Sequence, residues 1–162
     1  MLLRQREILE SLPEQIDKST GKKELFKEKN GLLPSLTTVL LLEMEKFNRL
    51  LSVIQRSLKD IERAIYGFIL MSEDLDGMYI SLQNGTVPSN WAAVGYPSLK
   101  PLATWYEDLK LRVEMFRLWL VEGNPHAYWL SGFFFPQGFM TGSLQTHARL
   151  HKIPIDKISF GF

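Results

Sequence analysis

The chain has 162 residues, a length that favours one domain with its own hydrophobic core. Hydrophobic residues make up 45% and charged residues 23%, which excludes wholesale disorder and fibrous repeats. The net charge of +1 gives no general attraction to nucleic acid or membranes, and the absence of cysteine excludes disulfides and cysteine metal sites.

The first part of the sequence predicts a short helix, a polar connector and a long helix. Apolar residues among charges predict an amphipathic helix over 3–12, which Pro13 ends. Residues 13–30 are polar and lysine-rich, so we expect a mobile connector. From residue 35, apolar residues recur at three- and four-residue steps over about eight turns, which predicts one long helix over about 35–66.

The middle of the sequence predicts two further helices separated by a loop. A second helical pattern covers residues 68–83, and the three prolines in residues 86–101 predict an irregular loop. A third amphipathic helix is predicted from Pro101 to Gly123, with Trp105 and Phe116 on its apolar face. We therefore expect Trp105 and Phe116 to be packing residues.

An aromatic segment, residues 125–149, dominates the C-terminal quarter. Its first part, as far as Phe135, is predicted as a turn or short strand, and a fourth helix is predicted to begin at Pro136. Asp156 is the only carboxylate side chain after Glu122, so this quarter is typical of an interface or a core rather than of a solvated face. The predicted packing or interface residues of this quarter are Trp129, Phe133, Phe134, Phe135 and Phe139.

The last residues predict a strand. Ile158, Phe160 and Phe162 alternate with small residues, as in a strand with one apolar face. Because no partner strand is predicted, we expect these residues to be part of a larger fold. The predicted fold class is mainly α: a bundle of about four to six helices, including the long one, with a short orphan strand at the C-terminus.

The histidines do not form a convincing site. His147 and His151 have the spacing of a zinc pair, but a third ligand is hard to supply. His126 lies near Ser131 in sequence, yet no orienting acid is visible. An enzyme working through these histidines is the weakest of our hypotheses.

Two further short motifs also lack required residues. Residues 19–23, STGKK, have neither the earlier glycine nor the hydroxyl of a phosphate-binding loop. Glu73, Asp74 and Asp76 lack the alternate ligands and closing glutamate of a calcium loop. We predict no catalytic, cofactor-binding or metal-binding residues in these 162 positions.

Several stretches carry a family resemblance, in the same order along the sequence. They are SLPEQID (11–17), FNRLL (47–51), NGTVPSNW (84–91), YPSLKPL (96–102), SGFFFPQGFMTGSLQTHAR (131–149) and IPIDKISF (153–160). Together they resemble the C-terminal region of dynein heavy chains, and the phenylalanine block resembles the axonemal, inner-arm type.

The resemblance implies a place in a motor protein. The region follows the sixth AAA+ module, begins with helices, continues into a β portion, and lies across the ATPase ring. On this basis residues 1–34 are a short helix and connector, 35–152 the helical bundle, and 153–162 the start of the β portion. The implied localisation is the cytoskeleton of the cytoplasm, in the axoneme of cilia and flagella.

The implied function is structural and regulatory support of ATP-driven, minus-end-directed movement, without catalysis by this segment. The implied partners are the AAA+ ring and β portion of the same heavy chain, with other dynein subunits beyond them. The microtubule is contacted only through the parent motor, and neither nucleic acid nor membrane is a partner. A second hypothesis is a stand-alone helical adaptor that binds a partner protein through residues 128–139.

Overall fold

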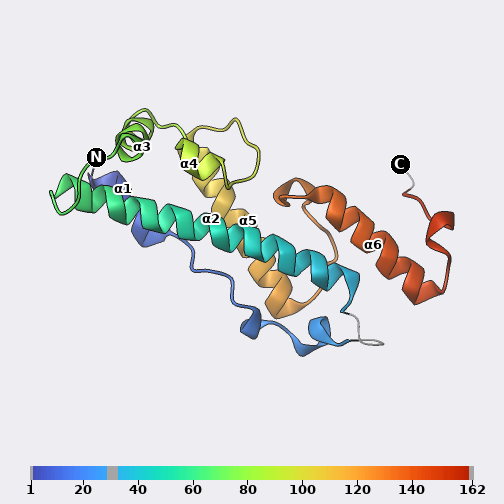
Figure 1. Ribbon diagram of the computed structural model, residues 1–162. Coiled ribbons are helices and arrows are strands. Elements are labelled where there is room, and N and C mark those ends of the chain that lie inside the picture. Colours follow the sequence, from blue (N-terminus) through green and yellow to red (C-terminus); the bar gives the residue numbers. More distant parts are fainter. Residues whose placement is uncertain (1, 29–32, 161–162) are drawn as a thin grey trace. The chain divides into compact units, whose positions relative to one another are not determined.

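The structure is a computed structural model that describes residues 2–28 and 33–160, and it is mainly helical there (Figure 1). The prediction of a mainly α fold is confirmed. The α-helices are α1 (Leu2–Ser11), α2 (Ser35–Ile65), α3 (Glu73–Gln83), α4 (Ser89–Ala92), α5 (Leu102–Glu122) and α6 (Pro136–His151). Short 3-10 helices lie at η1 (Lys18–Thr20), η2 (Lys23–Phe26), η3 (Leu130–Gly132) and η4 (Ile155–Lys157).

The predicted C-terminal strand is not shown among the residues that the structure describes. Ile158 has an extended backbone, with φ −115° and ψ 132°, but residues 158–160 belong to no strand. Phe162 lies outside the described residues. Alternation makes an extended backbone favourable, but a strand also needs a neighbour to receive its hydrogen bonds, and none of the described segments provides one.

The fold divides into two compact units, and α2 and α5 each contribute to both. The first unit comprises α1, α2 from Lys46 onward, α3, α4 and α5 as far as Glu114. The second comprises the early part of α2, the end of α5 and α6, together with the 3-10 helices.

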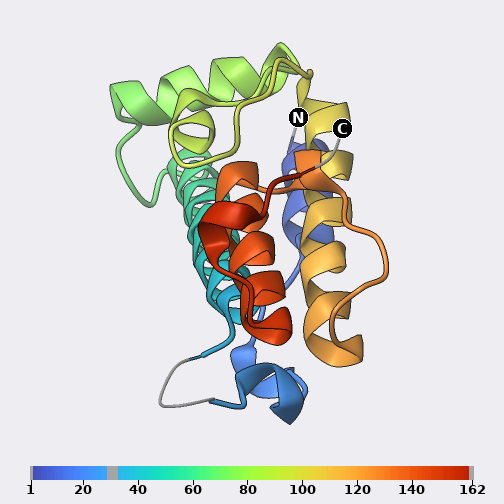
Figure 2. The same ribbon diagram turned by 90° about the vertical axis from the view of Figure 1, so that its right-hand side faces the viewer.

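In the first unit, α1 packs along both long helices. Arg6 lies 3.1 Å from the Glu62 carboxylate of α2, and the Tyr106 hydroxyl of α5 donates to the Ile8 carbonyl at 3.0 Å. Figure 2 shows α1, in blue, beside the yellow part of α5. The apolar stripe of α2 faces inward here, with Phe47, Leu50, Leu51, Ile54, Leu58 and Ile61 all buried.

Indole and phenol rings also pack in this core. Trp105 is 1% exposed and stacks on Trp91 and Tyr96, with ring centroids 6.0 and 5.6 Å away. The guanidinium of Arg112 lies 3.7 Å from the centre of the Tyr96 ring and pairs with the buried Asp108 carboxylate at 3.0 Å. A buried charge is tolerated when it is paired in this way.

In the second unit, the segment predicted as a connector has local structure that its composition did not indicate. The Lys22 backbone N–H donates to the Leu120 carbonyl at 2.8 Å, and the Lys22 ammonium donates to the Glu122 carbonyl at 2.7 Å. Leu25 is buried, and its carbonyl accepts the Thr37 hydroxyl. These bonds attach η2 to the end of α5 and to the first turn of α2.

Candidate interaction surface

Aromatic rings from three segments meet in the core of the second unit. Phe133, just after η3, packs edge-on against Phe116 of α5 at 5.2 Å and lies 4.8 Å from Phe139 of α6. Tyr128 lies 4.5 Å from Phe139 and 5.2 Å from Trp119. Tilted and edge-on pairs at these distances stabilise a core beyond the area they bury. Phe116, Phe133 and Phe139 are thus buried, and Phe133 contacts both of the other rings within the unit.

A buried carboxylate fixes the backbone between η3 and α6. Glu43 of α2 is 2% exposed and accepts hydrogen bonds from the N–H groups of Phe134 at 2.7 Å and Phe135 at 3.0 Å. Pro136 follows at the first position of α6, where its missing N–H costs nothing. Two adjacent backbone donors thus share one charged acceptor, which stabilises this turn strongly.

Glu43 is not among the packing or interface residues predicted from the sequence. The signal was its register: Glu43 follows Leu40 by three positions and precedes Phe47 by four, so it shares their buried face. A carboxylate on an apolar stripe needs a donor from another segment. Which segment supplies that donor could not be read from the sequence.

The other predicted aromatic residues of the C-terminal quarter lie nearer the surface. Trp129 is 37% exposed and Phe135 is 55% exposed, while Phe134 is half-buried. The Phe135 ring lies against Gly138, where a Cβ would come within 2.6 Å of the ring. Trp105 belongs to the first unit, whereas the aromatic segment belongs to the second.

A groove in the second unit, which we call the α2–α6 groove, runs beside Phe135 and has a volume of about 430 Å³. Its lining comes from the start of α2, from Phe135 and from one face of α6. The lining residues are Leu33, Ser35, Thr38, Val39, Leu42, Phe135, Gly138, Thr141, Gly142, Gln145 and Arg149. It is mostly apolar and contains no carboxylate among these described residues.

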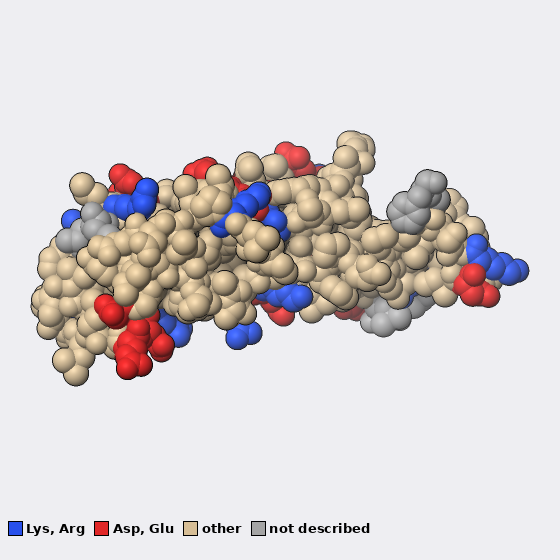
Figure 3. Space-filling model, turned by 90° about the horizontal axis from the view of Figure 1, so that it is seen from above, with Lys and Arg blue, Asp and Glu red and all other residues tan. Residues whose placement is uncertain are grey.

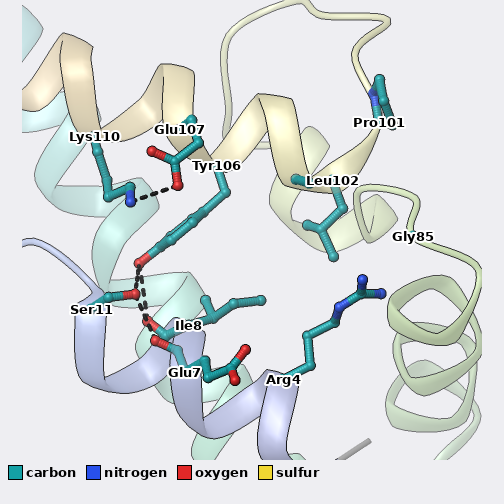
Figure 4. A pocket seen from close by; sticks show the side chains of 11 residues that line it. Arg4, Glu7, Ile8, Ser11, Gly85, Pro101, Leu102, Tyr106, Glu107 and Lys110 are labelled. Atoms are coloured by element: carbon teal, nitrogen blue, oxygen red, sulfur yellow. Dashed lines mark hydrogen bonds and ion pairs between the residues drawn. The ribbon is translucent and has the colours of Figure 1, made fainter.

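A second pocket, of about 330 Å³, lies in the first unit between α1 and α5 (Figure 4). Ser11 donates to the Glu7 carbonyl at 2.6 Å and lies 3.1 Å from the Tyr106 hydroxyl. Burial raises the pKa of Tyr106. Glu107 pairs with Lys110 at 2.7 Å, and no histidine belongs to the described lining. The contact between the Ser11 and Tyr106 hydroxyls thus joins α1 to α5.

The other sequence candidates lie at helix ends. His147 and His151 are exposed, with ring centroids 4.3 Å apart. Glu73, Asp74 and Asp76 occupy the first turn of α3, where carboxylates stabilise the positive end of the helix dipole. Within residues 2–28 and 33–160, no three histidine, aspartate or glutamate side chains come together as a metal site needs.

The charge pattern agrees with the balanced composition. Basic and acidic side chains are interspersed on the face drawn in Figure 3, and much of that face carries neither. No helix in the described part of the protein has the length and apolar character to cross a membrane.

Comparison with known proteins gives consistent matches along the whole sequence. The family model for the C-terminal domain of dynein heavy chains matches residues 2–162. Human dynein axonemal heavy chain 6 is 49% identical over 152 residues, which cover 93% of this chain and 4% of that protein. Human dynein axonemal heavy chain 1 is 49% identical over 128 residues, which cover 79% of this chain and 3% of that protein.

An algal relative agrees with the human ones. The dynein-1-beta heavy chain of the flagellar inner arm I1 complex, from Chlamydomonas reinhardtii, is 42% identical over 155 residues, covering 96% of this chain and 3% of that protein. The 162 residues thus span only a few per cent of the length of these relatives.

Proposed function

Because this chain belongs to the family of C-terminal domains of dynein heavy chains, we propose that it is a non-catalytic structural and regulatory segment of an axonemal dynein heavy chain. In this role it packs against the AAA+ ATPase ring of the same heavy chain. It supports ATP-driven, minus-end-directed movement along microtubules in the axoneme of cilia and flagella.

The observation that carries this proposal is the identity of 49%, over 93% of the sequence, to an axonemal heavy chain. Among other relatives is a heavy chain of the flagellar inner arm, which supports the axonemal assignment. The partners we propose are the AAA+ ring, the β portion of the heavy chain and other dynein subunits. Contact with the microtubule is made by the parent motor.

A non-catalytic role is supported by what the polar groups do. The Ser11 and Tyr106 hydroxyls join α1 to α5, and the Glu43 carboxylate joins α2 to the aromatic segment. Each of these groups makes bonds that hold the fold, and a catalytic nucleophile or base would need a partner in reacting geometry. The exposed aromatic rings of Trp129 and Phe135 suit an interface.

Deletion of residues 2–162 from a full-length axonemal heavy chain tests the proposal. We expect the motor to keep basal ATP turnover but to lose part of its stimulation by microtubules and to move at an altered velocity. Unchanged coupling and unchanged movement would refute the regulatory role. A motor carrying only Glu45→Ala, at an exposed position of α2, is the control.

ATP turnover by the purified 162-residue protein tests the absence of catalysis. We expect turnover no faster than buffer alone. Robust turnover that a single polar substitution abolishes would refute this part of the proposal.

A further inference from the structure

The α2–α6 groove has an apolar rim formed by two exposed side chains. Leu42 of α2 is 54% exposed and Phe135 is 55% exposed, and both line the groove. Large apolar side chains that border a concave surface are typical of binding sites rather than of a solvated face. The volume of about 430 Å³ falls within the range of about 300–1,000 Å³ found for sites that enclose a ligand.

Phe135 is held in place before any partner binds. Its backbone N–H is bound by the Glu43 carboxylate at 3.0 Å, and its ring lies against Gly138. An aromatic side chain that is already ordered loses little entropy on binding, so it is a favourable anchor for an interface. The buried carboxylate therefore positions the rim of the groove as well as the turn.

Arg149 is the one charged residue among the described lining residues of the groove. It is exposed and lies in the last turns of α6. A guanidinium binds a carboxylate through two parallel hydrogen bonds, a geometry that selects aspartate or glutamate. The groove itself supplies no carboxylate among its described lining, so a carboxylate on an occupant would be the complementary charge to Arg149.

We propose that the α2–α6 groove binds a segment of the same heavy chain, from outside these 162 residues, that carries apolar side chains and an aspartate or glutamate. This inference rests on the proposed function, which places the packing partner in the same polypeptide. The relatives extend far beyond the matched region, since it covers 4% or less of each of the three named above. The apolar side chains of the segment pack on Leu42 and Phe135, and its carboxylate pairs with Arg149.

Photo-crosslinking in a full-length axonemal heavy chain tests this proposal. A benzophenone amino acid replaces Phe135 in one motor and Leu150, which is 65% exposed and outside the groove lining, in a control motor. Only motors that keep basal ATP turnover are compared. We expect position 135 to crosslink to one segment of the same heavy chain, with an acidic residue close to the crosslinked position, at a yield several-fold above position 150.

The charge requirement is tested in the same motor. Arg149→Glu should lower the yield from position 135 by about fivefold, because it replaces attraction with repulsion, whereas Arg149→Lys should keep most of it. The proposal is overturned if the crosslinks stay within these 162 residues, reach a different polypeptide, do not exceed the control, or are insensitive to Arg149→Glu.

A third probe separates this inference from the proposed function. The same amino acid is placed at Phe68, which is 76% exposed in the first unit. Crosslinks from position 68 to the AAA+ ring, with none from position 135, would overturn the groove inference and leave the proposed function in place. The absence, from all three positions, of any crosslink to the heavy chain outside these 162 residues would contradict both.

Discussion

Removal of the Glu43 carboxylate should loosen the turn that precedes α6. This carboxylate is 2% exposed and accepts the N–H groups of Phe134 and Phe135 at 2.7 and 3.0 Å. Glu43→Ala removes both hydrogen bonds and leaves a small cavity. Glu43→Gln keeps one oxygen acceptor but turns an amide NH₂ toward the second backbone donor.

The size of the effect follows from the number and kind of bonds. A hydrogen bond to a charged group contributes about 1.5–3 kcal/mol, so two bonds contribute about 3–6 kcal/mol. The two backbone donors are only part-buried, so water reaches them in the variant and offsets some of this loss. We expect Glu43→Ala to lower the free energy of unfolding by about 3 kcal/mol, and Glu43→Gln by about half as much.

Urea titration of the 162-residue protein, followed by tryptophan fluorescence, measures these differences. The matched control is Glu45→Ala, at an exposed position two residues along α2, which should change stability by less than about 0.5 kcal/mol. Equal effects of Glu43→Ala and Glu45→Ala, or a loss below about 1 kcal/mol for Glu43→Ala, would refute the reasoning.

Three further predictions use the same titration. Trp105→Ala and Phe116→Ala should each lower the free energy of unfolding by about 3–5 kcal/mol, because the two side chains are 1% and 0% exposed. A loss below about 1 kcal/mol would show that this face of α5 is exposed to solvent. Gly77→Ala should stabilise the protein by about 1 kcal/mol, because Gly77 has open space around it in α3. Gly142→Ala should destabilise the protein by a similar amount, because the new Cβ would lie 2.9 Å from a methyl carbon of Val39 in α2. A reversal of either sign would contradict the corresponding prediction. Burial raises the pKa of Tyr96 above its ordinary value near 10, so the unfolded protein releases this proton at a lower pH than the folded protein does. Stability should therefore hold below about pH 10 and fall as the pH rises past it. Tyr96→Phe should reduce this fall, and an unchanged pH profile in the variant would contradict the prediction.

Helix positions were largely predictable because a helix that buries one apolar face has apolar residues at three- and four-residue steps. The predicted helix over 35–66 is α2, and the predicted start of the fourth helix at Pro136 is confirmed by α6. The second helix was predicted to begin at 68 but begins at Glu73. Phe68 and Leu70 continue the apolar pattern yet are 76% and 93% exposed, and the Ser72 hydroxyl caps α3 by accepting the Leu75 N–H at 3.3 Å.

The aromatic segment was recognisable from the sequence, but the roles of its residues were not. Phe133 and Phe139 are buried, whereas Phe135, only two residues from Phe133, is half exposed. Composition cannot separate these roles, since all three have the same side chain. The separation depends on how η3 and Pro136 turn the backbone and on the carboxylate that holds the turn.

The helical class, the long helix and the family could all be read from the amino acids alone, because they depend on local periodicity and on contiguous motifs. The use of Glu43, the exposure of Phe135 and the conformation of residues 158–160 depend instead on tertiary contacts. Glu43 and Phe134 are 91 positions apart, so their bond depends on which segments the fold brings together. A strand likewise forms only where a neighbour accepts its hydrogen bonds, and the alternating pattern of residues 158–160 carries no information about that neighbour.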